Sequence, residues 1–212
     1  MTSREERLAA VYAAGDREDL ERQYKDWAEH YEADVFAMGY SVPGMVAAMV
    51  ARHLPTNASP ILDCGAGTGL LGVLLAALGY RGLTAIDMSP DMLARAEARG
   101  LYDACRRMVL GERLDFPDDQ FAGVVAAGVF TAGHAPAESF AELCRVTRPG
   151  GLVIFGARVD GDYGAPYRAQ QDALENAKRW RLETASEPYP AFLVAPEEAH
   201  VRNRVFVYRV AE

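Results

Sequence analysis

The sequence predicts a doubly wound α/β fold with a mostly parallel seven-stranded sheet, from two patterns that follow one another along the chain. Residues 1–55 show a helical amphipathic pattern, and from residue 60 short apolar runs alternate with longer amphipathic segments. Strands that alternate with helices pair in parallel through right-handed crossovers, and helices then cover both faces of the sheet. We therefore expect a single domain over residues 1–212, with a helical lid at 1–55, a ligand-binding core at 60–157, and a cap helix and terminal strand pair at 158–212.

The lid region is expected to contain two amphipathic helices. Four large side chains recur at helical spacing and share one face: Leu20, Tyr24, Trp27 and Tyr31. A second helix is predicted over residues 42–54, and the proline-bounded segment 55–60 ends it.

The core and tail are predicted element by element. Apolar runs predict strands at 61–63, 83–86, 108–110, 123–127 and 152–155, with helices at about 68–79, 90–99 and 136–146. The helix at residue 90 has a capping hydroxyl at Ser89 and proline at its first position. The tail is expected to form a helix over 166–180 and two strands, 182–189 and 201–210, that pair antiparallel at the edge of the sheet.

Glycines at positions 65, 67 and 69 follow the first predicted strand and precede a helix. Glycine permits positive φ and lets a ligand approach the backbone, and doubly wound sheets bind ligands at the carboxyl ends of their strands. Asp87 ends the second predicted strand, where its carboxylate can accept hydrogen bonds from both hydroxyls of a ribose. These features predict a nucleoside cofactor. They leave adenosylmethionine and a dinucleotide both open, because residues 67–72 also satisfy the dinucleotide pattern.

The register of the glycines favours adenosylmethionine. In a dinucleotide fold the first glycine follows the strand at once, whereas Gly67 comes four residues after Asp63. The carboxylate of Asp63 suits the ammonium of a methionine moiety, and it would repel a pyrophosphate.

Several segments, in order along the chain, resemble the motifs of class I S-adenosylmethionine-dependent methyltransferases. These segments are residues 61–69, 85–92, 114–121 and 143–151, and the resemblance covers about residues 60–157. Further segments are similar to the methyltransferase-like proteins of the Williams–Beuren region, namely 24–35, 99–102 and 128–136. The resemblance implies the doubly wound fold, S-adenosylmethionine as cofactor and methyl transfer as the activity.

The resemblance also implies which residues bind the cofactor. The expected set is Tyr24, Trp27, Tyr31, Asp63, Cys64, Gly65, Ala66, Gly67, Asp87, Met88, Met92, Leu110, Gly111, Ala127 and Gly128. Leu110 stands where many members of the family carry an acid, so the adenine is expected at backbone groups near Gly111, with the two methionines against its ring. The three aromatic residues are expected to close over the cofactor with their faces near the sulfonium, and the alternative is a stripe of core side chains.

The acceptor is predicted to be a small molecule held between the N-terminal helices, the loop 128–136 and the segment 158–167. His134 is the candidate general base in that loop, and an ordinary loop histidine is the alternative. A cofactor-binding protein without methyl transfer and a nicotinamide-dependent oxidoreductase are the rival functions.

Composition narrows the partners. The net charge is −8 and no basic run is present, so nucleic acid is not expected as a substrate. No apolar run reaches the roughly 20 residues of a membrane span, the three cysteines are widely spaced, and no metal site is predicted. We expect a cytoplasmic protein and leave its oligomeric state open.

Overall fold

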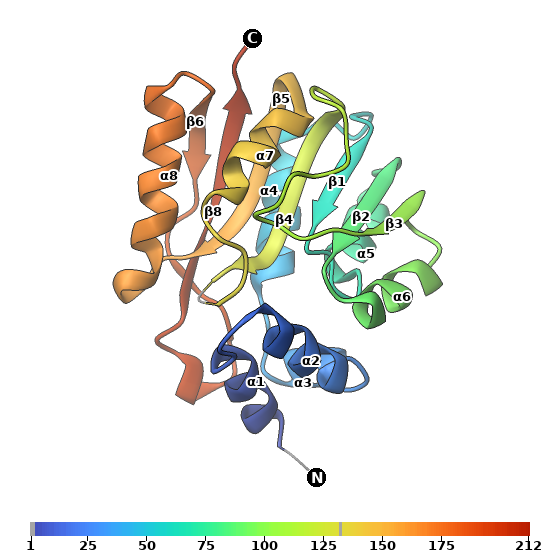
Figure 1. Cartoon of the computed structure of the whole chain (residues 1–212), viewed down its shortest axis with the longest axis vertical. Helices are drawn as coiled ribbons and strands as arrows, with labels where there is room; N and C mark the ends of the chain where they lie inside the picture. Colours follow the sequence, from blue (N-terminus) through green and yellow to red (C-terminus); the bar gives the residue numbers. More distant parts are fainter. Residues whose placement is uncertain (1–2, 132) are drawn as a thin grey trace.

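The computed structural model describes residues 3–131 and 133–212 as a twisted sheet with helices on both faces (Figure 1). The strands run in the order β3-β2-β1-β4-β5-β8-β6, and the short β7 pairs with β8. Their bounds are β1 Ile61–Cys64, β2 Leu83–Asp87, β3 Ala104–Arg107, β4 Phe121–Phe130, β5 Thr147–Arg158, β6 Trp180–Ala185, β7 Tyr189–Pro190 and β8 Arg202–Val210. Strands β1 to β5 pair in parallel, and β8 runs antiparallel to β5 and β6. The predicted fold class and terminal strand pair are therefore confirmed.

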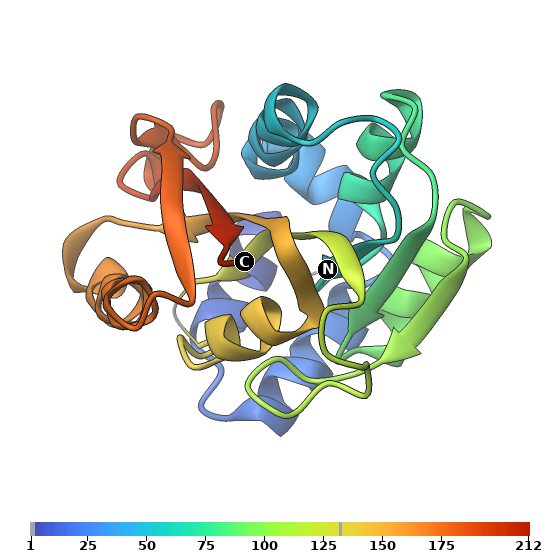
Figure 2. The same ribbon diagram turned by 90° about the horizontal axis from the view of Figure 1, so that it is seen from above.

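The helices divide into a lid and two covering layers. Their bounds are α1 Arg4–Tyr12, α2 Arg17–Trp27, α3 Tyr31–Ala37, α4 Val42–His53, α5 Leu70–Ala77, α6 Pro90–Ala98, α7 Ser139–Val146 and α8 Ala165–Asn176, with short 3-10 helices η1 Gly161–Gly164 and η2 Pro196–Glu198. One apolar core packs α4 and α5 against the sheet, and the second packs α7 and α8 against the opposite face (Figure 2). Helices α1 to α3 lie together at one end of the sheet (Figure 1).

The central strands are apolar because both of their faces are buried. All four residues of β1 are buried, and β4 is buried continuously from Phe121 to Ala126. Parallel strands covered on both sides by helices show such unbroken apolar runs. The predicted start of α6 is also confirmed, since the Ser89 hydroxyl accepts a hydrogen bond from the Met92 backbone N–H.

The third strand was predicted in the wrong place. It spans Ala104–Arg107, whereas the apolar run 108–110 lies just beyond it and lines a cavity. Because β3 is an edge strand that pairs only with β2, its side chains can stay partly exposed, as Arg106 and Arg107 do. The apolar run therefore marks a binding wall and not a strand.

The lid helix predicted through Tyr31 is broken. Helix α2 ends at Trp27 and α3 begins at Tyr31, and between them the His30 backbone N–H donates to the Trp27 carbonyl. The turn brings Asp34 back to the Trp27 indole, which donates a hydrogen bond to its carboxylate at 2.7 Å. Within the described parts of the chain, none of the helices combines the length and apolar character that a membrane span requires.

Candidate active site

The glycine turn lies between β1 and α5, at the point where the chain order of the sheet reverses between β1 and β4. A Cβ at Gly65 would lie 2.1 Å from Val129 Cγ1 on β4, so only glycine fits where these strands diverge. At Gly67 the backbone has φ +56° and no atom lies within 4 Å of an added Cβ, which leaves it bare toward a cavity. Such a switch point at the carboxyl ends of the strands is where doubly wound folds bind ligands.

Asp87 at the end of β2 closes the turn. Its Oδ2 accepts the Gly67 N–H at 2.8 Å, and its Oδ1 accepts the Ser89 N–H at 2.9 Å. Burial raises the pKa of Asp87, and these backbone donors oppose the rise. Each carboxylate oxygen retains acceptor capacity toward a ligand hydroxyl.

Asp63 at the end of β1 is buried, with 1% of its surface exposed. Tyr102 donates its hydroxyl to Asp63 Oδ2 at 2.7 Å, while Oδ1 is buried and has no hydrogen-bond partner among the described residues. Burial raises the pKa of Asp63 to about 7, the Tyr102 hydrogen bond lowers it and the charge of Asp87 raises it. A buried carboxylate oxygen without a donor is costly, so this atom is suited to a cationic ligand group.

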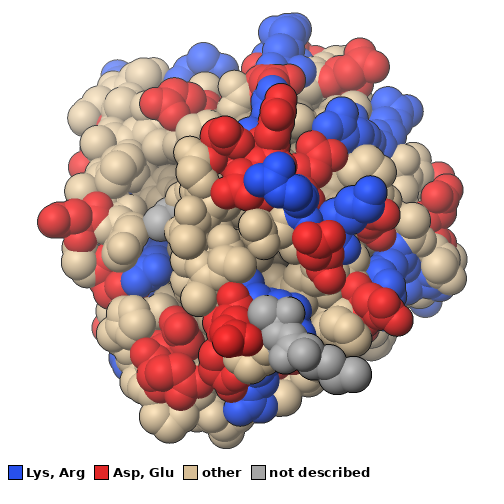
Figure 3. Space-filling view, turned by 60° about the horizontal axis from the view of Figure 1, so that its bottom comes forward, with Lys and Arg blue, Asp and Glu red and all other residues tan. Residues whose placement is uncertain are grey.

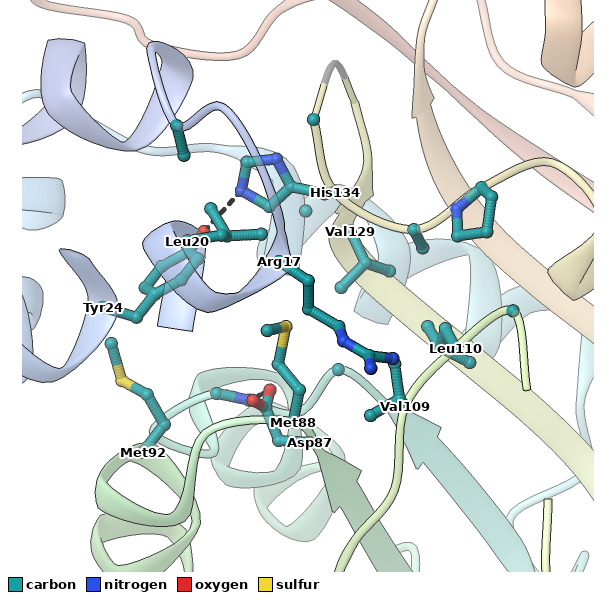
Figure 4. A pocket seen from close by; sticks show the side chains of 18 of the residues that line it. Arg17, Leu20, Tyr24, Asp87, Met88, Met92, Val109, Leu110, Val129 and His134 are labelled. Atoms are coloured by element: carbon teal, nitrogen blue, oxygen red, sulfur yellow. Dashed lines mark hydrogen bonds between the residues drawn. The ribbon is translucent and has the colours of Figure 1, made fainter. Parts of the chain in front are cut away.

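Three cavities surround these groups, and the largest, the main cavity, has a volume of about 520 Å³. The predicted binding residues that line it are Tyr24, Tyr31, Gly65, Gly67, Asp87, Met88, Met92, Leu110, Gly111, Ala127 and Gly128, together with His134. Figure 4 labels Tyr24, Asp87, Met88, Met92, Leu110 and His134 among them. A small cavity of about 30 Å³ lies against Asp63 and Ala66. The side chain of Cys64 is buried in the core between the sheet and α7, and burial raises the pKa of its thiol well above the ordinary value.

The third cavity, called the aromatic cavity, has a volume of about 50 Å³ and lies between the lid and β4. Its walls include Leu8, Val11, Tyr12, Tyr24, Trp27, Tyr31, Tyr40, Thr131, His134, Phe192 and Asn203. Tyr31 lines all three cavities, so the spaces converge on its ring.

Comparison with known proteins agrees with this geometry. A family model described as a methyltransferase domain matches residues 62–155. Methyltransferase-like protein 27 of Homo sapiens is 35% identical over 181 residues, which cover 81% of this chain and 74% of the human protein. Phosphatidylethanolamine N-methyltransferase of Cereibacter sphaeroides is 33% identical over 177 residues, which cover 79% of this chain and 83% of that protein.

The chain belongs to the class I S-adenosylmethionine-dependent methyltransferases. The resemblance expected from the sequence is thereby confirmed. A solved TehB-like S-adenosylmethionine-dependent methyltransferase from Corynebacterium glutamicum has the same fold, with a TM-score of 0.64 at 18% identity over 90% of this chain and 99% of that one.

The chemistry of the site fits the cofactor of this methyltransferase family. The unpartnered oxygen of Asp63 suits an ammonium, Asp87 suits ribose hydroxyls, and the bare backbone at Gly67 permits close approach. The main cavity lies within the usual range for small-molecule sites, roughly 300–1,000 Å³. Across residues 3–131 and 133–212, no group of three or more His, Cys, Asp or Glu side chains is arranged to hold a metal ion.

His134 and Tyr24 face each other in the wall that the main cavity and the aromatic cavity share. The Tyr24 hydroxyl and His134 Nε2 are hydrogen-bonded at 2.7 Å, as Figure 4 shows. Burial raises the pKa of Tyr24 well above its ordinary value, so this phenol stays neutral. The sequence predicted both residues as site residues. It did not predict the bond between them, because that bond joins α2 to the loop after β4, far along the chain.

Trp27 belongs to the interior of the lid and does not line the main cavity. It is 2% exposed, and its indole shares the Asp34 carboxylate with the Arg7 guanidinium, whose Nε lies 2.7 Å from Oδ2. Burial disfavours ionisation of Asp34, but the hydrogen bonds from Arg7 and Trp27 outweigh it and hold its pKa below the ordinary value. The alternative of a core side chain therefore describes the packing of Trp27.

Ion pairs join the lid to the core, and one of them, Arg17–Glu112, lines the main cavity. Arg107, the last residue of β3, lies 3.1 Å from Glu21 of α2, and further pairs join Arg99 to Glu32 and Arg17 to Glu112. Figure 4 shows Arg17 reaching from the lid toward Val109 and Leu110. On the face seen in Figure 3, acidic and basic side chains are interspersed, as such pairing requires.

The segments that wall the aromatic cavity differ in part from those that the sequence predicts around the acceptor. The segment 158–167 does not contribute a side chain to it, and residues 191–203 take its place through Ala191, Phe192, Val201 and Asn203. Arg158 instead pairs with Asp160 and stacks on Tyr163, with its guanidinium 4.0 Å from the ring centre. The sequence missed Tyr12, Tyr40, Tyr102, Phe192 and Asn203, which come to the site from separate segments.

Proposed function

We propose that this methyltransferase acts on a small, uncharged or amine-bearing acceptor whose reacting group lies in the aromatic cavity. The observation that carries this proposal is the convergence of three cavities on Tyr31. A methyltransferase must hold a nucleoside, an amino-acid moiety and an acceptor around one reacting centre, and three cavities that share the wall residue Tyr31 suit that requirement.

In this proposal the cofactor is held by residues of the strand ends. Asp87 accepts hydrogen bonds from the ribose, Asp63 Oδ1 accepts one from the ammonium, and Met88 and Met92 pack on the adenine. When bound, S-adenosylmethionine supplies an electrophilic methyl group on a sulfonium. Tyr31 helps to exclude water from the junction and turns an electron-rich ring toward that positive centre.

His134 is proposed to take the proton that the acceptor loses. Its imidazole lines both the main and the aromatic cavity, and its Nε2 is bonded to a buried, neutral phenol. In the tautomer that this role requires, Nε2–H donates to the phenol oxygen of Tyr24, which orients the ring, and the neutral imidazole takes the proton from the acceptor and passes it toward solvent.

The class of acceptor follows from the walls of the aromatic cavity. Among the described residues that line it, none is Lys or Arg, so no side-chain cation is available to pair with a carboxylate or phosphate. Its aromatic rings favour apolar groups and cations. One relative, named as a phosphatidylethanolamine N-methyltransferase, is 33% identical to this chain, and its name supports nitrogen as the methylated atom.

A panel of acceptors tests the proposal. The purified chain is incubated with S-adenosylmethionine and small amines, phenols, thiols and carboxylates, and adenosylhomocysteine and methylated products are measured by mass spectrometry. We expect methylation of amines or uncharged acceptors. Turnover restricted to anionic acceptors would contradict the proposed class, and tight cofactor binding with no turnover would support the non-catalytic alternative.

A further inference from the structure

Tyr102 is the donor nearest to the buried carboxylate of Asp63, and it lies outside the glycine turn. It sits in the loop between α6 and β3, in the segment 99–103, and its hydroxyl donates to Asp63 Oδ2 at 2.7 Å. The bond joins residues 39 positions apart in the sequence. Nothing in the mechanism above uses this phenol.

The start of α5 is shaped to receive the Tyr102 ring. A Cβ at Gly72 would lie 2.1 Å from the Tyr102 hydroxyl oxygen, and one at Gly69 would lie 3.2 Å from Cε2. Both glycines therefore leave room for the phenol to reach Asp63. The ring lies against the start of α5 and packs on the apolar cluster of Ala66, Ala85 and Leu93, so the hydroxyl has a fixed direction.

The hydrogen bond divides the two oxygens of Asp63 between two tasks. Oδ2 is satisfied by Tyr102, and Oδ1 is left without a partner among the described residues, beside the small cavity. If Oδ2 lost its donor, the carboxylate could rotate, and both oxygens would compete for any ligand cation. Tyr102 thus determines which oxygen is presented to the cavity.

We infer that Tyr102 is a positioning residue for the amino-acid end of the cofactor, acting through Asp63. This inference rests on the proposed cofactor site and adds to it a residue that holds no contact with the ligand itself. Removing the hydroxyl is expected to lower the affinity for ligands that carry the ammonium and to leave the affinity for ligands that lack it unchanged.

The same geometry gives an expected pH dependence. The titratable groups around Asp63 are Tyr102, Asp87, Cys64 and Cys105, with Tyr31 and Tyr40 across the small cavity. Burial raises the pKa of Asp63 to about 7 and the Tyr102 hydrogen bond lowers it. An ammonium binds the ionised carboxylate, so affinity rises with pH through this range, and loss of the hydroxyl moves the rise to higher pH.

Two ligands and one substitution test the inference. Adenosylhomocysteine carries the ammonium, and 5′-methylthioadenosine lacks the whole amino-acid end. In calorimetric titrations of the full chain at pH 8, Tyr102→Phe is expected to weaken adenosylhomocysteine roughly tenfold, as for loss of a hydrogen bond to a charged group, and to leave 5′-methylthioadenosine within about twofold. Tyr80→Phe is the matched control, because its buried hydroxyl donates to backbone carbonyls of α4 and the following residue and not to the site.

The outcomes separate this inference from the proposed function. Equal weakening of both ligands by Tyr102→Phe, or of neither, overturns the positioning role. Failure of the unmodified chain to bind adenosylhomocysteine overturns the proposed function as well. If Tyr102→Phe does not fold, Gly72→Ala gives the second test, because its Cβ would lie 2.1 Å from the Tyr102 hydroxyl oxygen and displace it from Asp63. That variant is expected to weaken adenosylhomocysteine and to spare 5′-methylthioadenosine, and an equal effect on both ligands contradicts the inference.

Discussion

The cofactor side and the acceptor side of the site are built in different ways. The cofactor side comes from two strand ends and the turns that follow them, with Asp63, Gly67 and Asp87 fixed by backbone hydrogen bonds and by the sheet. The proposed acceptor side is assembled from the lid, the loop after β4 and the chain between β7 and β8, which lie far apart in the sequence and meet through side-chain packing and a few hydrogen bonds.

This difference indicates which side of the site can change its ligand specificity through substitutions. A site made by local backbone geometry tolerates few substitutions, since a Cβ at Gly65 already meets Val129. A site made by side chains from distant segments can alter its shape through any of them while the scaffold stays the same. The cofactor side is therefore expected to control ligand binding, and the acceptor side to control turnover.

The largest expected effect is a loss of turnover from a substitution on the proposed acceptor side. His134→Asn is expected to lower kcat/KM for the acceptor identified by the panel about 100- to 1000-fold, because the proton acceptor is lost. The affinity for adenosylhomocysteine is expected to change less than about threefold, because other residues, such as Asp63 and Asp87, make the contacts proposed for the cofactor. His200→Asn, at an exposed position, is the control. Unchanged kcat/KM in His134→Asn would contradict the proposed role.

The next largest effect is a loss of ligand affinity from a substitution on the cofactor side. Asp87→Asn is expected to weaken adenosylhomocysteine about 100-fold in calorimetric titration, because charge-assisted hydrogen bonds to the ribose are lost. Asp91→Asn, in the first turn of α6 and exposed, is the matched control. If both variants bind equally well, Asp87 does not hold the ribose.

A substitution of Asp63 tests whether its buried carboxylate destabilises the chain when no ligand is bound. Its folded pKa is about 7 against an ordinary value of 3.8. Between these pH values the folded chain holds the extra proton, so stability falls as pH rises toward 7 and the loss is complete above it. At pH 8 without ligand, Asp63→Asn is therefore expected to have a free energy of unfolding roughly 1–3 kcal/mol above that of the unmodified chain and to unfold at a higher temperature. Near pH 4 the two chains are expected to unfold at nearly the same temperature.

The measurement for Asp63 is thermal unfolding at both pH values. Asp91→Asn again serves as the control, since its carboxylate is exposed. A lower unfolding temperature of Asp63→Asn at pH 8 would show that the ionised carboxylate stabilises the unliganded chain, contrary to the burial of an oxygen that has no donor among the described residues.

The smallest expected effect concerns the interior of the lid. Trp27→Phe removes the indole donor to Asp34 but leaves Arg7 in place. Denaturant unfolding is expected to show a loss of about 1–2 kcal/mol, while adenosylhomocysteine affinity stays within about twofold. Unchanged stability with lost affinity would instead assign Trp27 to the cofactor, as the sequence first suggested.

The sequence was informative where function depends on local backbone. The turn after β1, the acid at the end of β2 and the start of α6 are each encoded within a few adjacent residues, so their patterns were readable. The register of β3 was not, because an edge strand of Ala-Cys-Arg-Arg lacks the apolar signal that the cavity wall at 108–110 carries.

Contacts between distant segments were beyond the reach of the sequence pattern. The bonds Tyr24–His134 and Tyr102–Asp63 span 110 and 39 positions, and neither partner signals the other. The break between α2 and α3 was hidden because Trp27 and Tyr31 keep helical spacing on either side of a turn. The acceptor side could be predicted only as a location.

Amide hydrogen exchange with and without adenosylhomocysteine tests the central claim most directly, since that claim unites the glycine turn and the lid around one ligand. We predict slower exchange, on ligand binding, in residues 65–69 and 87–92 and also in residues 24–31 of the lid. Slower exchange at the turn with an unchanged lid, or no change in either, would contradict a shared site centred on Tyr31.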